Sequence, residues 1–240
     1  MNYITIGDKN KTAVVFLHGW GGSIDSWGVI PVKIASFGFY SIVVDFPGFG
    51  KTPEPSEPYG VQDYMLELKN LLNILSVDSC VLVGHSFGGR VAIKFASFYK
   101  DVVSKLILVD SAGVLPRRGL IHKFKVWSYK RAKIKASKGI IPMSKLDKYG
   151  SDDYKNLSNV MKATFVRVVN EDLVCDARKI QCETLLVWGR NDKSTPIYMA
   201  KKLKKEIKNS RLEIYCAGHF SYLECMEQFI DEIYIFMISS

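Results

Sequence analysis

Residues 80–93 decide the fold, and they read CVLVGHSFGGRVAI. The first four are an apolar run that contains two valines, which is typical of a buried strand, and the last four begin a helical pattern. Between them lies the motif Gly-x-Ser-x-Gly, centred on Ser86. A strand, this motif and then a helix indicate a sharp, strained turn that exposes the serine for nucleophilic attack. Glycine at positions 84 and 88 leaves the turn room to form. We therefore predict Ser86 as a nucleophile.

Short apolar runs of the same character recur along the chain, at residues 13–17, 41–44, 106–109, 185–188 and 212–215. Helical patterns occupy residues 61–75, 87–98, 196–208 and 221–238. Strands that alternate with helices predict βαβ units and an α/β fold, with a doubly wound, mostly parallel sheet. The segment before residue 13 has room for one further strand.

One long stretch breaks this alternation. Residues 115–173 contain helical patterns but no strand-like run, although core strands precede and follow them. We predict a core formed by residues 1–114 and 174–240, with residues 115–173 inserted as a helical cap. The cap would lie over the carboxyl ends of the strands, where open α/β sheets bind ligands.

A serine needs a base to become a good nucleophile, and that base is usually a histidine. His219 follows the last predicted strand, where a loop can extend to Ser86, and we predict it as the base. His85 is adjacent to Ser86 but is expected to point away from the site. His18 follows a strand in a glycine-rich loop and is expected to brace that loop, and His122 lies in a basic stretch and is expected to be solvated.

The histidine in turn needs a carboxylate to orient it. Asp192 stands in a turn-rich segment after the strand at 185–188, and it gives the chain order Ser, Asp, His. Asp110, which ends the strand at 106–109, is the competing candidate, although we favour Asp192. Asp45 ends its strand before a proline- and glycine-containing loop, and we expect it to order that loop.

The negative charge that develops on a substrate oxygen needs hydrogen-bond donors, and each is worth about 3–4 kcal/mol in mutational tests. The backbone N–H of Phe87, directly after the nucleophile, is one candidate. The second is the N–H of Trp20, in the loop at 18–22 that reads HGWGG. Glycines there allow the backbone to approach the site closely.

Taken together, these segments resemble the α/β-hydrolase superfamily over nearly the whole chain. The matching segments are 18–22, 45–50, the turn at Ser86, 188–192 and 218–220, which read HGWGG, DFPGFG, GHSFG, WGRND and GHF. The resemblance is strongest to the small capped branch that contains carboxylesterases and carbon–carbon bond hydrolases. It implies a Ser86–His219–Asp192 triad and an oxyanion hole from Trp20 and Phe87. Because position 86 is serine, the carboxylate-nucleophile chemistry of epoxide hydrolases and haloalkane dehalogenases is disfavoured.

The function we predict is hydrolysis of carboxylic esters of small to medium size through an acyl-enzyme, with no cofactor and no metal. Two alternatives stay open. The same triad would serve a carbon–carbon bond hydrolase acting on ring-fission diketones, although Phe220 stands where such enzymes often have tryptophan. A ligand-binding protein on the same fold, with little turnover, is the other.

Composition agrees with one domain carrying a modest insertion. The chain has 240 residues, 48% of them hydrophobic, and its five cysteines show no CxxC spacing that would indicate a zinc site or a disulfide framework. Neither a leader peptide nor an apolar run long enough for a membrane span is visible, so we expect a cytoplasmic enzyme with a small-molecule substrate.

The net charge of +9 is unevenly distributed, because residues 117–138 hold nine Lys and Arg residues and no acidic residue. The plainest interpretation is the solvated face of a cap helix. The alternatives are steering of an anionic substrate and peripheral contact with an anionic membrane surface. We do not expect nucleic-acid binding, because no recognised binding motif accompanies the charge.

Overall fold

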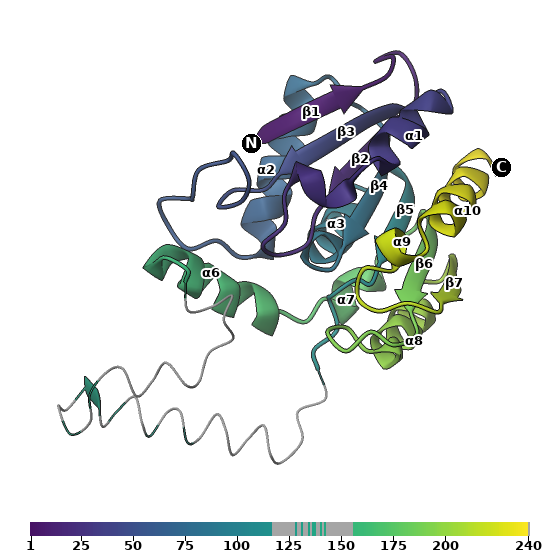
Figure 1. Cartoon of the computed structure of the whole chain (residues 1–240). Helices are drawn as coiled ribbons and strands as arrows, with labels where there is room; N and C mark the ends of the chain where they lie inside the picture. Colours follow the sequence, from purple (N-terminus) through teal and green to yellow (C-terminus); the bar gives the residue numbers. More distant parts are fainter. Residues whose placement is uncertain are drawn as a thin grey trace.

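The computed structural model describes residues 1–116 and 156–239, together with a few isolated positions between them. A seven-stranded sheet lies at its centre, in the order β1-β3-β2-β4-β5-β6-β7 (Figure 1). The strands are β1 (Asn2–Ile6), β2 (Ala13–Leu17), β3 (Tyr40–Asp45), β4 (Cys80–His85), β5 (Val103–Val109), β6 (Glu183–Gly189) and β7 (Ser210–Tyr215). β1 pairs with β3 in antiparallel orientation, and all other neighbouring strands are parallel. The predicted mostly parallel α/β sheet is confirmed, and each predicted strand lies within an observed one.

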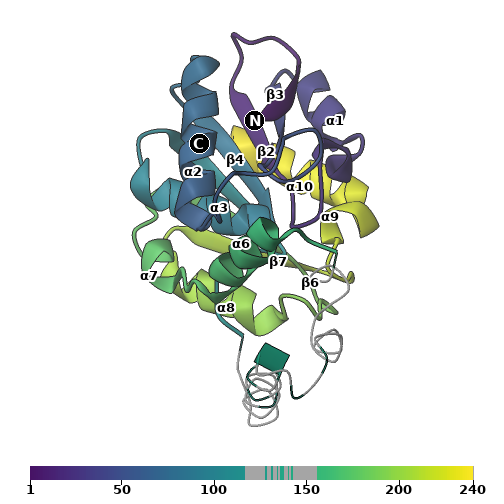
Figure 2. The same cartoon turned by 90° about the vertical axis from the view of Figure 1, so that its left-hand side faces the viewer.

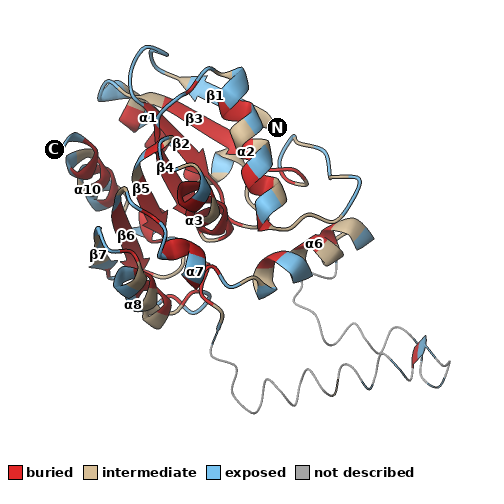
Figure 3. Cartoon of the chain, turned by 180° about the vertical axis from the view of Figure 1, so that it is seen from behind, coloured by how far each residue is buried: buried red, intermediate tan, exposed pale blue. Residues whose placement is uncertain are grey.

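Helices cover both faces of the sheet (Figure 2). One face carries α2 (Val61–Ile74), α3 (Phe87–Phe98) and α8 (Ile197–Glu206), and the other carries α1 (Ile30–Ser36) and α10 (Met226–Ile238). Alternate residues of each strand face opposite ways, so β2 places Val15 and Leu17 in the first core layer and Val14 and Phe16 in the second. Both faces of the central strands are therefore buried, as their continuous apolar runs predict, whereas the edge strands β1 and β7 are partly exposed (Figure 3).

Three short elements complete the core. The 3-10 helix η1 (Ile24–Trp27) leads into α1, α7 (Val174–Ala177) precedes β6, and α9 (Ser221–Glu224) precedes α10. Residues 221–238 therefore form two helices, not the single one expected, because the backbone of Cys225 leaves the helical range with φ −123° and ψ 48°. Among the residues the structure describes, no helix is both long enough and apolar enough to cross a bilayer.

Helix α6 (Asn159–Asn170) lies beside α2 and α3 (Figures 1 and 3), and its Met161 and Val168 are buried in the core on that face. Ser158 caps its N-terminus by accepting a hydrogen bond from the N–H of Met161 at 3.1 Å. The hydroxyl of Thr164 accepts a hydrogen bond from the Tyr59 N–H at 3.0 Å, which ties the middle of the helix to the loop between β3 and α2. α6 is consequently held in place by residues about 100 positions away in the sequence.

Candidate active site

The turn after β4 has the geometry that the motif predicts. Ser86 has φ 50° and ψ −109°, a strained conformation for a non-glycine residue, and it stands immediately before α3. A Cβ on Gly84 would lie 2.6 Å from the carbonyl oxygen of Gly88, and a Cβ on Gly88 would lie 2.2 Å from that of Leu17. Neither position has room for a side chain, because the first turn of α3 packs against the end of β4 at Gly84 and against the end of β2 at Gly88. The two glycines thus allow the turn that exposes Ser86.

Ser86, His219 and Asp192 lie in one hydrogen-bonded line. The Oγ of Ser86 is 3.0 Å from His219 Nε2, and His219 Nδ1 is 2.8 Å from Asp192 Oδ2. A carboxylate oxygen only accepts, so Nδ1 carries the hydrogen and Nε2 of the neutral ring is free to accept the serine proton. Ser86 precedes α3, Asp192 follows β6 and His219 follows β7, so three separate strand ends bring these side chains together.

The Asp192 carboxylate is surrounded by donors. Its Oδ1 accepts from the N–H groups of Ser194 and Thr195 at 2.7 and 3.0 Å, and its Oδ2 lies 2.6 Å from the hydroxyl of Thr195. Burial alone would raise the pKa of Asp192, but the hydrogen bonds from His219 and Thr195 outweigh it and hold the pKa below its usual value. Asp192 is therefore ionised at neutral pH and able to stabilise a protonated His219. Sequence reasoning did not select Thr195, because no motif marks it.

Asp110, the competing candidate for the acid, makes its hydrogen bonds away from His219. Its carboxylate accepts from the Gly189 N–H at 2.7 Å and from the N–H and hydroxyl of Ser221 at 3.0 and 2.6 Å. It therefore links the end of β6 to the start of α9. Burial raises its pKa to about 7, although these hydrogen bonds act in the opposite direction.

The loop at 18–22 is held against Ser86 by buried polar groups. His18 donates through Nδ1 to the carbonyl oxygen of Gly19 at 2.7 Å and accepts from the Phe46 N–H through Nε2 at 3.1 Å. A ring that donates at one nitrogen and accepts at the other is neutral, in agreement with burial lowering the pKa of His18. His18 thus braces the loop, as expected, and a Cβ on Gly19 would lie 3.4 Å from the Cβ of Ser86.

Asp45 orders the neighbouring loops. Its carboxylate accepts from the N–H of Ile24 at 2.7 Å, the N–H of Lys51 at 2.9 Å and the amide of Asn2 at 2.7 Å. Burial would raise the pKa of Asp45, but these donors lower it below its usual value. One carboxylate therefore joins three segments next to the site.

His85 is not placed as a base, because it is buried and neutral. His85 is 2% exposed, and burial lowers its pKa to about 3, so its ring is neutral at any ordinary pH. His122 lies outside the described residues, as does most of the basic stretch at 117–138.

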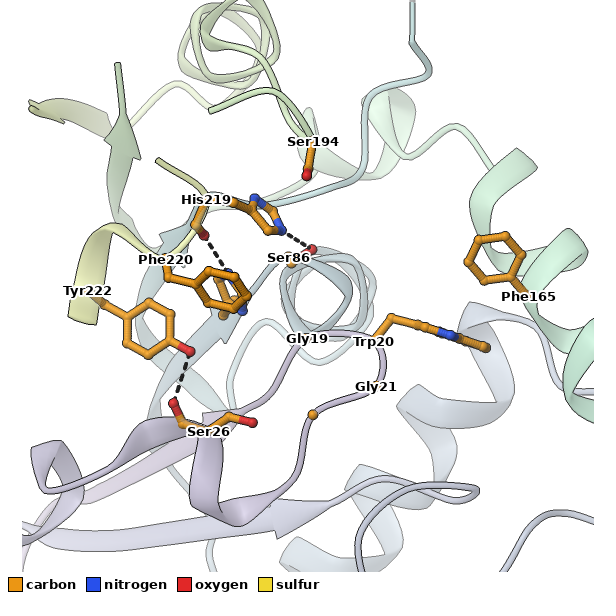
Figure 4. A pocket seen from close by; sticks show the side chains of 12 residues that line it. Gly19, Trp20, Gly21, Ser26, Ser86, Phe165, Ser194, His219, Phe220 and Tyr222 are labelled. Atoms are coloured by element: carbon orange, nitrogen blue, oxygen red, sulfur yellow. Dashed lines mark hydrogen bonds between the residues drawn. The ribbon is translucent and has the colours of Figure 1, made fainter. Parts of the chain in front are cut away.

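Two cavities meet at Ser86. The larger, about 540 Å³, extends past His219, Phe220 and Tyr222, and the smaller, about 310 Å³, extends along α3. Both are lined by Trp20, Ser86, Phe165 and Ser194. Figure 4 shows the Trp20 side chain turned away from Ser86 and towards Phe165 of α6, and the two rings are 5.1 Å apart. A substrate held by Ser86 would therefore have space on both sides of the reacting atom.

The comparison with known families agrees with this architecture. The family model described as alpha/beta hydrolase fold matches residues 12–139, which is more than half of the chain. The chain belongs to the alpha/beta hydrolase fold family.

Curated relatives match at different lengths. A 2-hydroxy-6-oxo-6-phenylhexa-2,4-dienoate hydrolase of Burkholderia cepacia is 26% identical over 244 residues, covering 90% of this chain and 84% of that protein. An uncharacterized protein of Mycobacterium tuberculosis is 35% identical over 102 residues, but these are 42% of this chain and only 30% of that protein. The chain therefore spans less than a third of the length of that mycobacterial relative.

Solved structures share the fold over the whole chain. An esterase from Exiguobacterium antarcticum has a TM-score of 0.78 and 24% identity, and covers 99% of this chain and 95% of its own. A bromoperoxidase from Bacillus anthracis has a TM-score of 0.80 and 22% identity, with coverage of 99% and 95%. At this level of identity the likeness establishes the fold.

Proposed function

We propose that this protein is a serine hydrolase that cleaves carboxylic esters of small to medium size through an acyl-enzyme. The observation that carries the proposal is the line of hydrogen bonds from Ser86 Oγ through His219 to Asp192, at 3.0 and 2.8 Å. Nucleophile, base and orienting acid in this relation are the requirements of covalent acyl transfer.

Acylation begins when Nε2 of His219 takes the hydroxyl proton of Ser86 while Oγ attacks the ester carbonyl carbon. The carbonyl electrons move onto oxygen, and the imidazolium that forms is stabilised by the ionised Asp192. The intermediate then collapses, the bond to the alkoxy group breaks, and His219 Nε2 gives its proton to the leaving alcohol. Ser86 is left esterified by the acyl group.

Deacylation repeats these steps with water. His219 removes a proton from a water molecule that attacks the acyl-enzyme, and it returns that proton to Ser86 Oγ as the acid leaves. In both halves the oxyanion is bound by the N–H groups of Trp20 and Phe87. The rings of these two residues are 5.4 Å apart, which supports a close approach of the loop to the start of α3. Helix α3 also places the positive end of its dipole near this oxygen.

The substrate range depends on the segment between β5 and β6. We propose that residues 115–173 act as a cap over a core of residues 1–114 and 174–240, in a cytoplasmic enzyme that needs neither cofactor nor metal. The position of helix α6 supports the proposal of a cap, because Phe165 of this helix lines both cavities at Ser86. A salt titration of kcat/KM on neutral and anionic esters tests whether the basic stretch at 117–138 steers substrates.

The proposal is tested with short p-nitrophenyl esters and a fluorophosphonate probe. Wild-type protein is expected to release p-nitrophenol and to be labelled at Ser86, and Ser86→Ala is expected to lose both while keeping its circular dichroism spectrum. Ser97→Ala, which removes a buried serine on the same helix, is the matched control and should keep both. Wild-type protein that neither turns over nor is labelled would instead indicate a ligand-binding protein on this fold.

Carbon–carbon bond hydrolysis is the second candidate, because the Burkholderia cepacia relative is named as a dienoate hydrolase. The same three residues would serve, with the cleaved bond joining two carbons of a vinylogous diketone. Parallel assays of a ring-fission dienoate and an acyl ester discriminate the two. Faster turnover of the dienoate would favour this candidate over the esterase.

A further inference from the structure

Arg90 is a buried cation in the wall of the smaller cavity. It stands four residues after Ser86 on α3, about 6 Å further along the helix axis, and its side chain lines the same cavity as Ser86. The residue is only 5% exposed. Burying a guanidinium is costly unless its donors are matched by acceptors, so its partners need to be accounted for.

The partners of Arg90 are few. Its Nη1 donates to the carbonyl oxygen of Glu171 at 2.7 Å, and a guanidinium has five such N–H donors. The side chain of Glu171 is engaged by Lys94 at 3.0 Å, and Lys94 also contacts Asp176 at 3.1 Å. Within the part of the chain that the structure describes, no carboxylate forms an ion pair with Arg90.

Arg90 stays charged in this setting. Burial lowers its pKa to about 10, with Glu171 and Asp172 acting in the opposite direction, so the group is a cation at neutral pH. The cavity around it is otherwise mainly apolar, with Phe87, Val114, Pro116, Val168 and Met199 in its lining. Among the lining residues that the structure describes, Arg90 is the only cation. An apolar cavity with one buried cation suits a ligand that has a hydrocarbon chain and one negative charge.

We propose that the smaller cavity binds the carboxylate of a substrate whose ester carbonyl lies at Ser86, with the Arg90 guanidinium as its partner. The substrates would be half-esters of dicarboxylic acids or other esters that carry a carboxylate in the acyl chain. Planar carboxylates match the fork of a guanidinium, which can donate two parallel hydrogen bonds to them. This inference rests on the proposed hydrolase function and names the substrate class for it.

The competing explanation is that Arg90 only caps the C-terminus of α6, since Glu171 directly follows that helix. Lys94 allows the two roles to be separated. It ties the same segment to α3 through its ion pairs with Glu171 and Asp176, but it is not part of the cavity lining. Loss of Lys94 would loosen the end of α6 without removing the cation from the cavity.

The test uses pairs of p-nitrophenyl esters whose acyl chains have equal length and end in either a carboxylate or a methyl group, from succinate to suberate. Without a buried partner, a carboxylate would be strongly disfavoured in an apolar cavity. At one chain length, the wild-type kcat/KM is expected to be about 10- to 100-fold higher for the ester that ends in a carboxylate than for the ester that ends in a methyl group. This difference corresponds to the free energy of one or two charge-assisted hydrogen bonds.

Arg90→Met is expected to abolish that preference. In Lys94→Met the ratio of kcat/KM for the carboxylate ester to kcat/KM for the neutral ester should stay within about threefold of the wild-type value. A wild-type preference for the neutral ester at every length would overturn the inference, as would an equal loss in both variants. Turnover of the neutral esters tests the hydrolase function separately. If neither ester is cleaved, calorimetry measures the binding of adipate to the wild type and to Arg90→Met. Binding to the wild type that is lost in Arg90→Met supports the site. If the wild type does not bind adipate, the inference is overturned.

Discussion

The imidazole of His85 is hydrogen-bonded to the main-chain carbonyl of His219. The Nε2 of His85 lies 2.9 Å from the carbonyl oxygen of His219, and the two ring centroids are 5.0 Å apart. Since a carbonyl only accepts, His85 donates, and it therefore holds the backbone of the residue we propose as the base. His85, which is adjacent to Ser86 in the sequence, thus fixes the loop that carries His219, whose ring contacts Ser86 in the structure.

Removal of this hydrogen bond is expected to slow catalysis without preventing substrate binding. In His85→Phe the carbonyl of His219 loses its donor, the base moves more freely, and kcat falls by about tenfold, the worth of one hydrogen bond. KM should change by less than about twofold, because His85 acts through His219. Steady-state kinetics on a p-nitrophenyl ester measure both values.

His85→Gln is the matched control for this prediction, because a glutamine amide also has N–H donors. It should recover part of the lost kcat. An equal loss in both variants, or a loss that appears in KM alone, would show that His85 does not position the base.

The two buried aspartates are expected to respond differently to the same substitution. Asp192→Asn removes the acceptor that keeps the hydrogen on Nδ1 of His219, so kcat should fall by about 10³- to 10⁴-fold with little loss of stability. Asp110→Asn replaces an acid that contacts Ser221 and Gly189, so its main effect should be a lower melting temperature. Kinetics and thermal unfolding of both variants check this. A larger loss of kcat in Asp110→Asn would reverse the assignment of the acid.

A methyl group at Gly88 is expected to destabilise the fold. Its Cβ would lie 2.2 Å from the Leu17 carbonyl oxygen, a backbone atom that cannot move without separating α3 from β2. Gly88→Ala should lower the free energy of unfolding by about 3 kcal/mol or more. Gly38→Ala is the control, because Gly38 has φ +91° but no atom within 4 Å, and it should cost only about 1 kcal/mol. Urea unfolding measures both, and equal costs would contradict the close packing at Gly88.

Buried His85 is expected to make the protein less stable in acid. Its pKa is about 3 in the folded state, against about 6.5 in an unfolded chain, so only the unfolded chain binds the proton between those values. The free energy of unfolding should fall as the pH decreases below about 6.5, by up to about 1.4 kcal/mol per pH unit for this group. His85→Gln should gain stability relative to the wild type between pH 6 and pH 5 in urea titrations. A difference that does not vary with pH would mean that His85 is not buried as a neutral ring.

Asp110 is expected to change the stability with pH in the opposite direction to His85, so that its contribution to the free energy of unfolding falls as the pH rises. Its pKa is raised to about 7 from 3.8, so the folded state keeps a proton that the unfolded chain releases between about pH 4 and pH 7. Its contribution to stability is present at low pH and is lost as the pH rises through about 7. Asp110→Asn should therefore be most destabilising, relative to the wild type, near pH 4, and the same urea titrations measure this. A cost that is largest at pH 8 would contradict the raised pKa.

The core of the fold could be predicted because its strands are buried on both faces. Such strands are continuous apolar runs, and the runs at 13–17 and 185–188 lie within β2 and β6. The turn at Ser86 was equally clear, since its motif lies directly between a strand run and a helical pattern, although the contact that requires Gly88 is with Leu17, far away in the sequence. Helix α1 was missed because it has only seven residues, with a proline as the second, so no full amphipathic pattern develops.

The fine geometry of the site could not be predicted, because it depends on contacts between distant loops. Asp110 and Asp192 both follow strand ends, and only the folded loops show which carboxylate His219 meets. Thr195 supports Asp192 through a tight turn whose backbone angles the sequence does not specify. The burial of Arg90 depends on Glu171, 81 positions away.

The anchoring of α6 has a consequence for how the site could diversify. Its N-terminal cap residue Ser158 donates to Glu54, its middle residue Thr164 meets Tyr59, and its end meets Arg90, so the helix is attached along its whole length. Phe165 projects from this fixed support into both cavities and takes no part in the proposed proton transfers. Mutation at that one position could therefore retune substrate preference while leaving the reactive groups aligned, which makes it a natural starting point for a directed-evolution library.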